Sequence, residues 1–292
     1  TLAEFMNRYN LDALFWHGCM IPVLYTLCTC DAKVLGEWPA APLLDFLHKM
    51  QQGSPLLRMY GGTHGFVEAL SQDLTFYSNA KVTKIVCGSE GVRVENAAGV
   101  CVDVDRVIVA TPTHVINFLD EDQFSNELRL LRQYQFTHGE LVIHRDEQCM
   151  PKDKKHWSAL SYCMDKNFNQ QMFSVWLNAV EPSLVGKGNI FQTWNPTISI
   201  REDLIIDRVQ LTRAIVDRET AKHTQSLMQL QQDANRQVYF CGSWLCDGLP
   251  VLESAVTSAM FVVEQMGVEA KFKGLTPEII PAQELQHVMA AT

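Results

Sequence analysis

The stretch Val238-Tyr-Phe-Cys-Gly-Ser-Trp244, followed by Gly248-Leu-Pro-Val-Leu-Glu-Ser-Ala-Val256, decides the fold. It predicts a strand, a glycine turn, a loop and a helix that runs to about Gly267. Apolar side chains recur at helical spacing and give this helix a buried face; they are Leu252, Ala255, Val256, Ala259, Met260 and Val263. A helix start offers free N–H groups and a positive dipole end to a ligand with anionic character. Taken alone, the segment also fits an ordinary βα unit of an α/β domain.

A second segment narrows the fold. Residues Tyr60-Gly-Gly-Thr-His-Gly-Phe-Val-Glu-Ala-Leu70 predict a strand, a glycine turn and a helix. The stretches 81–86, 91–95 and 100–104 alternate apolar and polar residues with turn residues between them, as a small antiparallel meander does. Residues 105–110 form a continuous apolar run into a turn, which is typical of a strand buried on both faces.

In this order the parts resemble the flavin-dependent amine oxidase-like superfamily, which includes monoamine and polyamine oxidases and phytoene-type desaturases. Members of that superfamily have a glycine pair before a helix, a strand, a hairpin and an apolar strand that ends in Ala-x-Pro. They close with a strand, a Cys-Gly turn, a loop and a helix that contacts the flavin. The resemblance covers the chain to about Gly267.

The middle of the chain is similar to a branch of predicted NAD/FAD-binding proteins within that superfamily. The matching stretches are His144–Pro151, Trp157–Tyr162, Val175–Asn178 and Thr193–Pro196. Some members of the branch are associated with the modification of fatty acyl chains. The resemblance therefore implies a cofactor class more firmly than a substrate.

The resemblance implies an α/β chain with a partial FAD/NAD(P)-binding domain and an α+β substrate lobe that contains a mostly antiparallel sheet. We expect residues 1–53 to form the helical part of the substrate lobe and 54–116 to form part of the FAD-binding domain. Residues 117–210 are expected to form the sheet of the substrate lobe. Residues 211–267 should return to the FAD-binding domain, and 268–292 form a tail.

One motif of such flavoproteins is missing from the sequence. Their first strand leads into a G-x-G-x-x-G turn that seats the FAD pyrophosphate on a helix N-terminus. Gly61, Gly62 and Gly65 have a different spacing and lie in another part of the family's order. We therefore expect this chain to be the C-terminal portion of a longer flavoprotein.

The resemblance implies FAD as the cofactor and assigns mostly backbone contacts to it. The main chain of Val82 would border the adenine, and the loop after the buried strand would lie beside the dinucleotide. The Cys-Gly turn would lie near the ribityl-pyrophosphate, and the start of the last helix would direct N–H groups at the flavin's pyrimidine end. The expected cofactor residues are Val82, Ala110, Thr111, Pro112, Gly242, Ser243, Leu252, Glu253, Ser254 and Ala255. Ser243 departs from the pattern, because many oxidases have an acidic residue there.

Five side chains are candidates for contact with the substrate. His144 ends a strand-like run, so it is a candidate acid/base or polar anchor, or a cap on a sheet edge. Trp157, Tyr162, Trp176 and Trp194 are candidates for the wall of an apolar cavity, although aromatic residues at strand spacing also form cores. The paired aromatic cage and the lysine of amine oxidases have no convincing counterpart in the sequence.

Charge and composition exclude several partners. The net charge of −9, without a run of Lys and Arg, argues against nucleic acid, and no apolar stretch is long enough to predict a membrane span. The nine cysteines show neither a disulfide framework nor metal-site spacing, which favours a reducing, cytoplasmic compartment. We therefore expect a small apolar substrate and no metal, and the sequence does not determine the oligomeric state.

These observations favour an FAD-dependent oxidoreductase that takes hydride from an apolar substrate, with desaturation or isomerisation of a fatty acyl chain as the leading candidate. Two alternatives stay open. One is a true amine oxidase. The other is a non-catalytic scaffold or binding module that has lost FAD.

Overall fold

The computed structural model describes the chain except residues 53–58, 60–61, 169–170, 246–247 and 269–292. Tyr60 and the tail, for which a strand and a linker or docking helix were expected, therefore lie outside the described residues. The remaining chain is a mixture of helices and mostly antiparallel sheets, as expected from the sequence.

The chain divides into two compact units. The first unit contains Thr1–Trp38 and Phe136–Ile215, and the second contains Pro39–Gln135 and Val216–Val268. Each unit is described by itself below.

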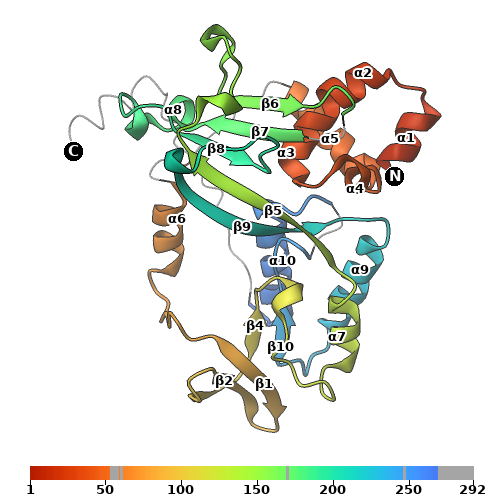
Figure 1. Ribbon diagram of the computed structural model, residues 1–292. Helices are drawn as coiled ribbons and strands as arrows, with labels where there is room; N and C mark the ends of the chain where they lie inside the picture. The colour runs from red at the N-terminus through yellow and green to blue at the C-terminus, as the bar shows by residue number, and fades with distance from the viewer. Residues whose placement is uncertain (53–58, 60–61, 169–170, 246–247, 269–292) are drawn as a thin grey trace. The chain divides into compact units, whose positions relative to one another are not determined.

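A five-stranded sheet forms the centre of the first unit, in the order β6-β7-β8-β5-β9 (Figure 1). Its strands are β5 (Gln135–His144), β6 (Leu160–Met164), β7 (Gln171–Trp176), β8 (Phe191–Trp194) and β9 (Ile205–Ile215). The pairs β6–β7, β7–β8 and β5–β8 are antiparallel. The expected boundary between residues 210 and 211 falls inside β9, because this strand continues without a turn residue to Ile215.

The helices of the first unit are short, and side chains cap the starts of α1, α2 and α4. They are α1 (Leu2–Arg8), α2 (Ala13–Phe15), α3 (Ile21–Cys28), α4 (Ala32–Gly36) and α8 (Leu177–Val180), with a π-helical turn at Trp16–Met20. Asp12 and Asp31 accept hydrogen bonds from backbone N–H groups in the first turns of α2 and α4. These caps satisfy donors that a helix start leaves unpaired.

The two faces of this sheet pack against different segments. Because side chains alternate along a strand, Phe173 and Trp194 share one face, where they pack with Tyr25 of α3. Val142 and Met172 belong to the opposite face and form a core with Cys149. The five-stranded sheet is therefore covered on both sides.

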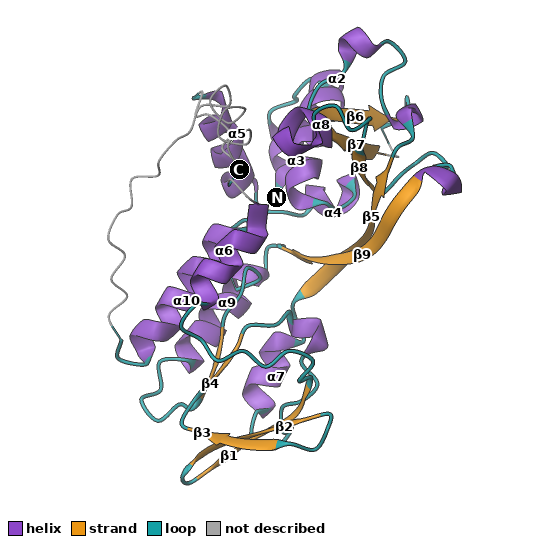
Figure 2. Cartoon of the chain, turned by 90° about the vertical axis from the view of Figure 1, so that its left-hand side faces the viewer, coloured by secondary structure: helices purple, strands orange, loops and turns teal. Residues whose placement is uncertain are grey.

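The second unit combines a three-stranded antiparallel sheet, a pair of parallel strands and several helices. Figure 2 distinguishes these helices in purple from the strands in orange. Its strands are β1 (Val82–Gly88), β2 (Gly91–Asn96), β3 (Cys101–Val104), β4 (Val107–Val109) and β10 (Val238–Phe240). Its helices are α5 (Ala40–Gln51), α6 (Gly62–Ser71), α7 (Ser125–Leu131), α9 (Thr220–Leu230) and α10 (Leu252–Gln265). The meander, β4 and the last helix form where the sequence predicted them. β4 is not buried on both faces, because Ile108 is exposed. The expected buried face of α10 was also wrong, because Leu252 and Val256 are exposed and the helix buries Ser258 and Val262 instead.

A buried ion pair connects three elements of the second unit. Arg236 Nη2 lies 2.8 Å from Glu127 Oε1 of α7, and both side chains are almost fully buried. The same guanidinium donates to the carbonyl oxygens of Leu230, at the end of α9, and Val238, at the start of β10. Arg236 therefore fixes the relative positions of α7, α9 and β10.

The cysteines of the strands differ in burial. Cys101 in β3 and Cys163 in β6 are exposed, whereas Cys241, directly after β10, is buried. In the part of the chain that the structure describes, no helix has both the length and the apolar character to cross a membrane.

Candidate functional site

Two turns lie side by side at the carboxyl ends of a parallel strand pair. Strands β4 and β10 pair in register, with Ile108 opposite Tyr239. The chain therefore leaves both strands at the same edge, where Cys241 N donates to Val109 O at 3.1 Å. The expected cofactor residues Ala110, Thr111 and Pro112 are exposed in the first turn, and Gly242 and Ser243 form the second. Ligands of open α/β sheets bind at such carboxyl edges.

Trp244 joins the two turns. Its indole Nε1 donates to Thr111 O at 3.0 Å. Gly242 has φ of +145°, and a Cβ at that position would lie 2.6 Å from Trp244 Nε1. Only glycine fits this combination of backbone angle and close approach. The glycine turn is thus required by the packing of Trp244.

Helix α10 begins beside these turns without a side-chain cap. Its N-cap residue is Val251, and the first helical hydrogen bond is Ala255 N to Val251 O at 3.2 Å. The N–H groups of Leu252, Glu253 and Ser254 precede that bond, so they have no acceptor within the helix. The exposed Glu253 adds a negative charge near them. Because the Glu253 carboxylate already lies there, the start of α10 suits a ligand edge with a partial negative charge better than a fully anionic group.

Val82 lies in a different sheet from the two turns. It is the first residue of β1, opposite Asn96, and the register shifts between Val82 and Lys84. No hydrogen bond within the described residues joins it to either turn. Its expected contact with adenine stays a prediction.

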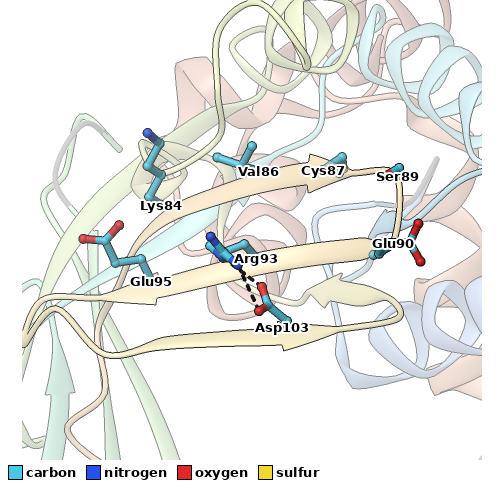
Figure 3. Close-up of a pocket in the computed structure, with 10 residues that line it drawn as sticks. Lys84, Val86, Cys87, Ser89, Glu90, Arg93, Glu95 and Asp103 are labelled. Atoms are coloured by element: carbon cyan, nitrogen blue, oxygen red, sulfur yellow. Dashed lines mark hydrogen bonds and ion pairs between the residues drawn. The ribbon is translucent and has the colours of Figure 1, made fainter.

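A hollow of about 550 Å³ lies on the charged face of the meander (Figure 3). Arg93 donates to both carboxylate oxygens of Asp103, at 2.8 and 3.1 Å, and this hydrogen bonding lowers the pKa of Asp103. Lys84 of β1 lies opposite Glu95 of β2. Charged side chains therefore share the lining of this hollow with Val86 and Cys87.

His144 is fully buried at the end of β5 in the five-stranded sheet. Its Nδ1 accepts the N–H of Asp146 at 3.1 Å, so the ring proton is on Nε2, which lies 2.7 Å from Thr193 Oγ1. Thr193 Oγ1 in turn lies 2.7 Å from Ser174 Oγ. Burial lowers the pKa of His144, although the charge of Asp146 opposes this shift. Both ring nitrogens are engaged on an inner strand, so the side chain neither caps a sheet edge nor faces a solvent-filled cavity.

The four expected cavity aromatics do not share one wall. Trp157 packs edge-on against Trp176, with ring centroids 5.3 Å apart. Tyr162 and Trp194 instead pack with Tyr25 on the other face of the sheet. Strand alternation separates the two pairs, because Trp176 and Trp194 occupy opposite-facing positions of neighbouring strands. The prediction of a single aromatic cavity was wrong in this respect.

The sequence analysis missed a cavity of about 460 Å³ within the first unit. Tyr25 and Asp31 reach it from α3 and the start of α4, and Gln171 and Asn195 reach it from β7 and the end of β8. These residues are far apart in the sequence, so no local pattern predicts their meeting. Among the described residues, no group of His, Cys, Asp and Glu is arranged to hold a metal ion.

Comparison with known proteins agrees with this architecture. One solved structure with the same fold is a CLA-producing fatty acid isomerase from P. acnes, with a TM-score of 0.54 and 14% sequence identity. The match covers 79% of this chain and 59% of that one, so the chain spans less than two thirds of its length. No curated protein matches the chain. The family model of flavin-containing amine oxidoreductases matches residues 2–196, more than half of the sequence. The chain therefore belongs to the flavin-containing amine oxidoreductase family.

Proposed function

We propose that the chain is part of an FAD-dependent oxidoreductase that takes hydride from an apolar substrate. The observation that carries this proposal is the meeting of two turns, at Ala110–Pro112 and Gly242–Ser243, beside the uncapped start of α10. Family membership supports a flavin. When bound, the flavin would supply the acceptor for the hydride.

The residues of the site fit such a group. Gly242 keeps the second turn free of a side chain, and the exposed turn at Ala110–Pro112 leaves backbone groups accessible. The first-turn N–H groups of α10 would stabilise negative charge that develops on the bound ring. The small side chain of Ala255, near the helix start, leaves room for a flat group there.

An acyl chain is the substrate class to examine first. The P. acnes isomerase acts on a fatty acid and has the same fold. Trp157 and Trp176 pack together and are only half-buried, so they provide apolar surface on one face of the sheet. Desaturation or isomerisation of such a chain is the reaction that we propose.

Titration of the purified chain with FAD tests the cofactor proposal. Flavin absorbance between roughly 370 and 450 nm and flavin fluorescence report binding. Leu252→Glu places a negative charge at an exposed first-turn position of α10, where it favours the helix but opposes an anionic ligand. We expect FAD to bind about two- to fivefold more weakly to this variant.

Ala41→Glu is the matched control, because Ala41 is an exposed first-turn residue of α5 in the same unit. It should leave FAD binding unchanged. Equal weakening by both variants would indicate a general charge effect and not a site at α10. Absence of any flavin signal with the wild-type chain would show that the two turns and the start of α10 do not hold FAD without a G-x-G-x-x-G motif.

A further inference from the structure

The orientation of the Trp244 indole determines how the two turns of the candidate site lie. The indole lies against Gly242 in one turn and donates to Thr111 O in the other, at 3.0 Å. Thr111 is exposed, and the next carbonyl, of Pro112, accepts the N–H of Val115 within the turn that follows. Side chains move between staggered rotamers unless packing prevents it. A rotation of the indole would therefore break its bond to Thr111 and free the first turn from the second.

Tyr134 is the residue that restricts such a rotation. Its ring packs edge-on against the Trp244 indole, with ring centroids 4.9 Å apart and an interplanar angle of 76°. This is the T-shaped arrangement that aromatic pairs prefer, and both side chains are buried. The ring of Tyr134 thus occupies the space that the indole would need in order to turn.

Tyr134 is itself fixed by two helices of the second unit. Its hydroxyl oxygen lies 3.0 Å from Thr224 Oγ1 of α9, and this hydrogen bond is buried. The ring of His223, on the same helix, lies edge-on to Tyr134 at 6.5 Å. The backbone N–H of Tyr134 donates to Leu131 O, at the end of α7, at 3.4 Å. The side chain is therefore attached to α9 and the main chain to α7, so Tyr134 gives the indole a rigid support.

We propose that Tyr134 is a positioning residue for the cofactor: through Trp244, it keeps the turns at Ala110–Pro112 and Gly242–Ser243 at the separation that FAD binding requires. The cofactor part of this inference rests on the proposed function, whereas the hold of Tyr134 on Trp244 does not. A residue that only fills the core would change stability but would leave the bond between Trp244 and Thr111 intact. The two roles therefore differ in a measurable way.

The indole N–H of Trp244 provides a readout that does not need FAD. A proton–nitrogen correlation spectrum resolves the indole signals of the six tryptophans, and Trp244→Phe identifies the signal that belongs to Trp244. The chemical shift of a hydrogen-bonded N–H changes less with temperature than that of a solvated one. We expect a weak temperature dependence in the wild-type chain and in Tyr134→Phe, which keeps the ring, and a steep one in Tyr134→Leu. A weak dependence in Tyr134→Leu overturns the proposal.

Titration with FAD tests the consequence for the cofactor. Tyr134→Leu should weaken FAD binding about two- to tenfold, the factor that corresponds to one aromatic pair. Tyr134→Phe should restore the affinity to within about twofold of the wild-type value, because it keeps that pair. Wild-type affinity in Tyr134→Leu would overturn the positioning role. If Tyr134→Leu does not fold, Tyr134→Met takes its place, since the flexible methionine side chain fills irregular gaps.

Glu127→Gln is the control for a loss of stability alone. It disrupts the buried ion pair with Arg236 in the same unit, and the Glu127 carboxylate bonds to Arg236 and not to Trp244. The folded control should keep both the wild-type indole signal and the wild-type FAD affinity. Losses equal to those of Tyr134→Leu would show a purely structural role and overturn the proposal.

The two measurements separate this inference from the proposed function. If the wild-type chain binds FAD and Tyr134→Leu binds it equally well, the inference fails and the proposed function stands. If the wild-type chain binds no FAD, the proposed function fails and the cofactor role of Tyr134 fails with it. A steep temperature dependence in Tyr134→Leu would in that case still support the hold of Tyr134 on Trp244.

Discussion

Ser258 holds the glycine turn of the candidate site through both backbone groups of Gly242. Its Oγ accepts the N–H of Gly242 at 3.0 Å, and its proton is within reach of two carbonyl oxygens, Gly242 O at 3.1 Å and Ala255 O at 3.0 Å. Ser258 is buried on α10, one turn beyond the helix start that faces the proposed flavin. One hydroxyl therefore fastens this helix to the end of β10.

Ser258→Ala should remove this connection. The N–H of Gly242 loses its partner, so we expect the free energy of unfolding to fall by about 1–3 kcal/mol. Urea denaturation followed by circular dichroism measures the change. Ser71→Ala is the control, because the Ser71 hydroxyl bonds only back to its own helix, at Val67 O and Glu68 O. A loss as large as that of Ser258→Ala in this control would contradict the assigned role.

Gly139→Ala should destabilise the first unit. A Cβ at Gly139 would lie 2.1 Å from Cζ2 of Trp194, in a packed sheet face. We expect a loss of about 1–3 kcal/mol, the usual cost of overpacking, measured as a lower denaturation midpoint. Combining Gly139→Ala with Trp194→Phe should recover part of the lost stability. Gly36→Ala, whose added Cβ meets Ala3 at an ordinary 3.4 Å, should cause no such loss.

The Arg236–Glu127 pair should be sensitive to removal of one partner. Glu127→Ala leaves a buried guanidinium without its counter-charge, so we expect a loss of about 3–5 kcal/mol in the free energy of unfolding. Asp45→Asn breaks the exposed pair with Lys49 and should cost less than about 1 kcal/mol. Similar losses in the two variants would show that burial of the first pair has no energetic consequence.

Because of His144, the free energy of unfolding should decrease as the pH is lowered. Burial lowers its pKa in the folded state, so the unfolded chain binds the proton more readily. The contribution of the neutral ring is complete above the unfolded pKa of about 6.5 and decreases as the pH falls through that value towards the folded pKa. Burial alone would raise the pKa of Asp146, but hydrogen bonds from Arg201 and Gln148 hold it below its ordinary value, so Asp146 stays charged in this range.

Urea denaturation between about pH 5 and 8 measures this dependence. His144→Gln should flatten the loss of stability with falling pH, whatever its effect on stability at neutral pH. Replacement of the exposed His64 by Gln should keep the wild-type slope. An unchanged slope in His144→Gln would contradict the prediction.

The cysteines should react with iodoacetamide in two groups. Cys28 and Cys30 are buried, and burial raises the pKa of both thiols, that of Cys30 to about 12. Thiolates react and thiols do not, so these two residues should stay unlabelled in the native protein. The exposed Cys101 and Cys163 should be labelled first. Mass spectrometry of peptides measures the order, and early labelling of Cys28 would contradict it.

The sequence predicted the elements better than their partners. The alternation in residues 81–104 predicted the meander, and the apolar run before Ala110 predicted β4, because each signal is local. It could not predict that Trp157 and Trp176 lie across the sheet from Tyr162 and Trp194. That separation depends on the registers of β6, β7 and β8, which long-range pairing determines.

The sequence also could not predict which side chains are hydrogen-bonded or grouped at the candidate sites. His144 ends a strand as predicted, but its ring nitrogens are engaged by Asp146 and by Thr193, the second of which is 49 positions away. Gln171 has no motif around it, and only the fold brings it to the same cavity as Tyr25 and Asp31.

The parallel pairing of β4 with β10 also has a consequence for biosynthesis. Trp244 and Thr111, which meet beside this pair, are 133 positions apart in the chain. During translation β4 emerges long before its partner, and the whole sheet of the first unit is made in between. Such distant contacts form late and slowly, so the cofactor turns should be the last part of the nascent chain to mature. Until then, the apolar edge of β4 is exposed to aggregation and to chaperones.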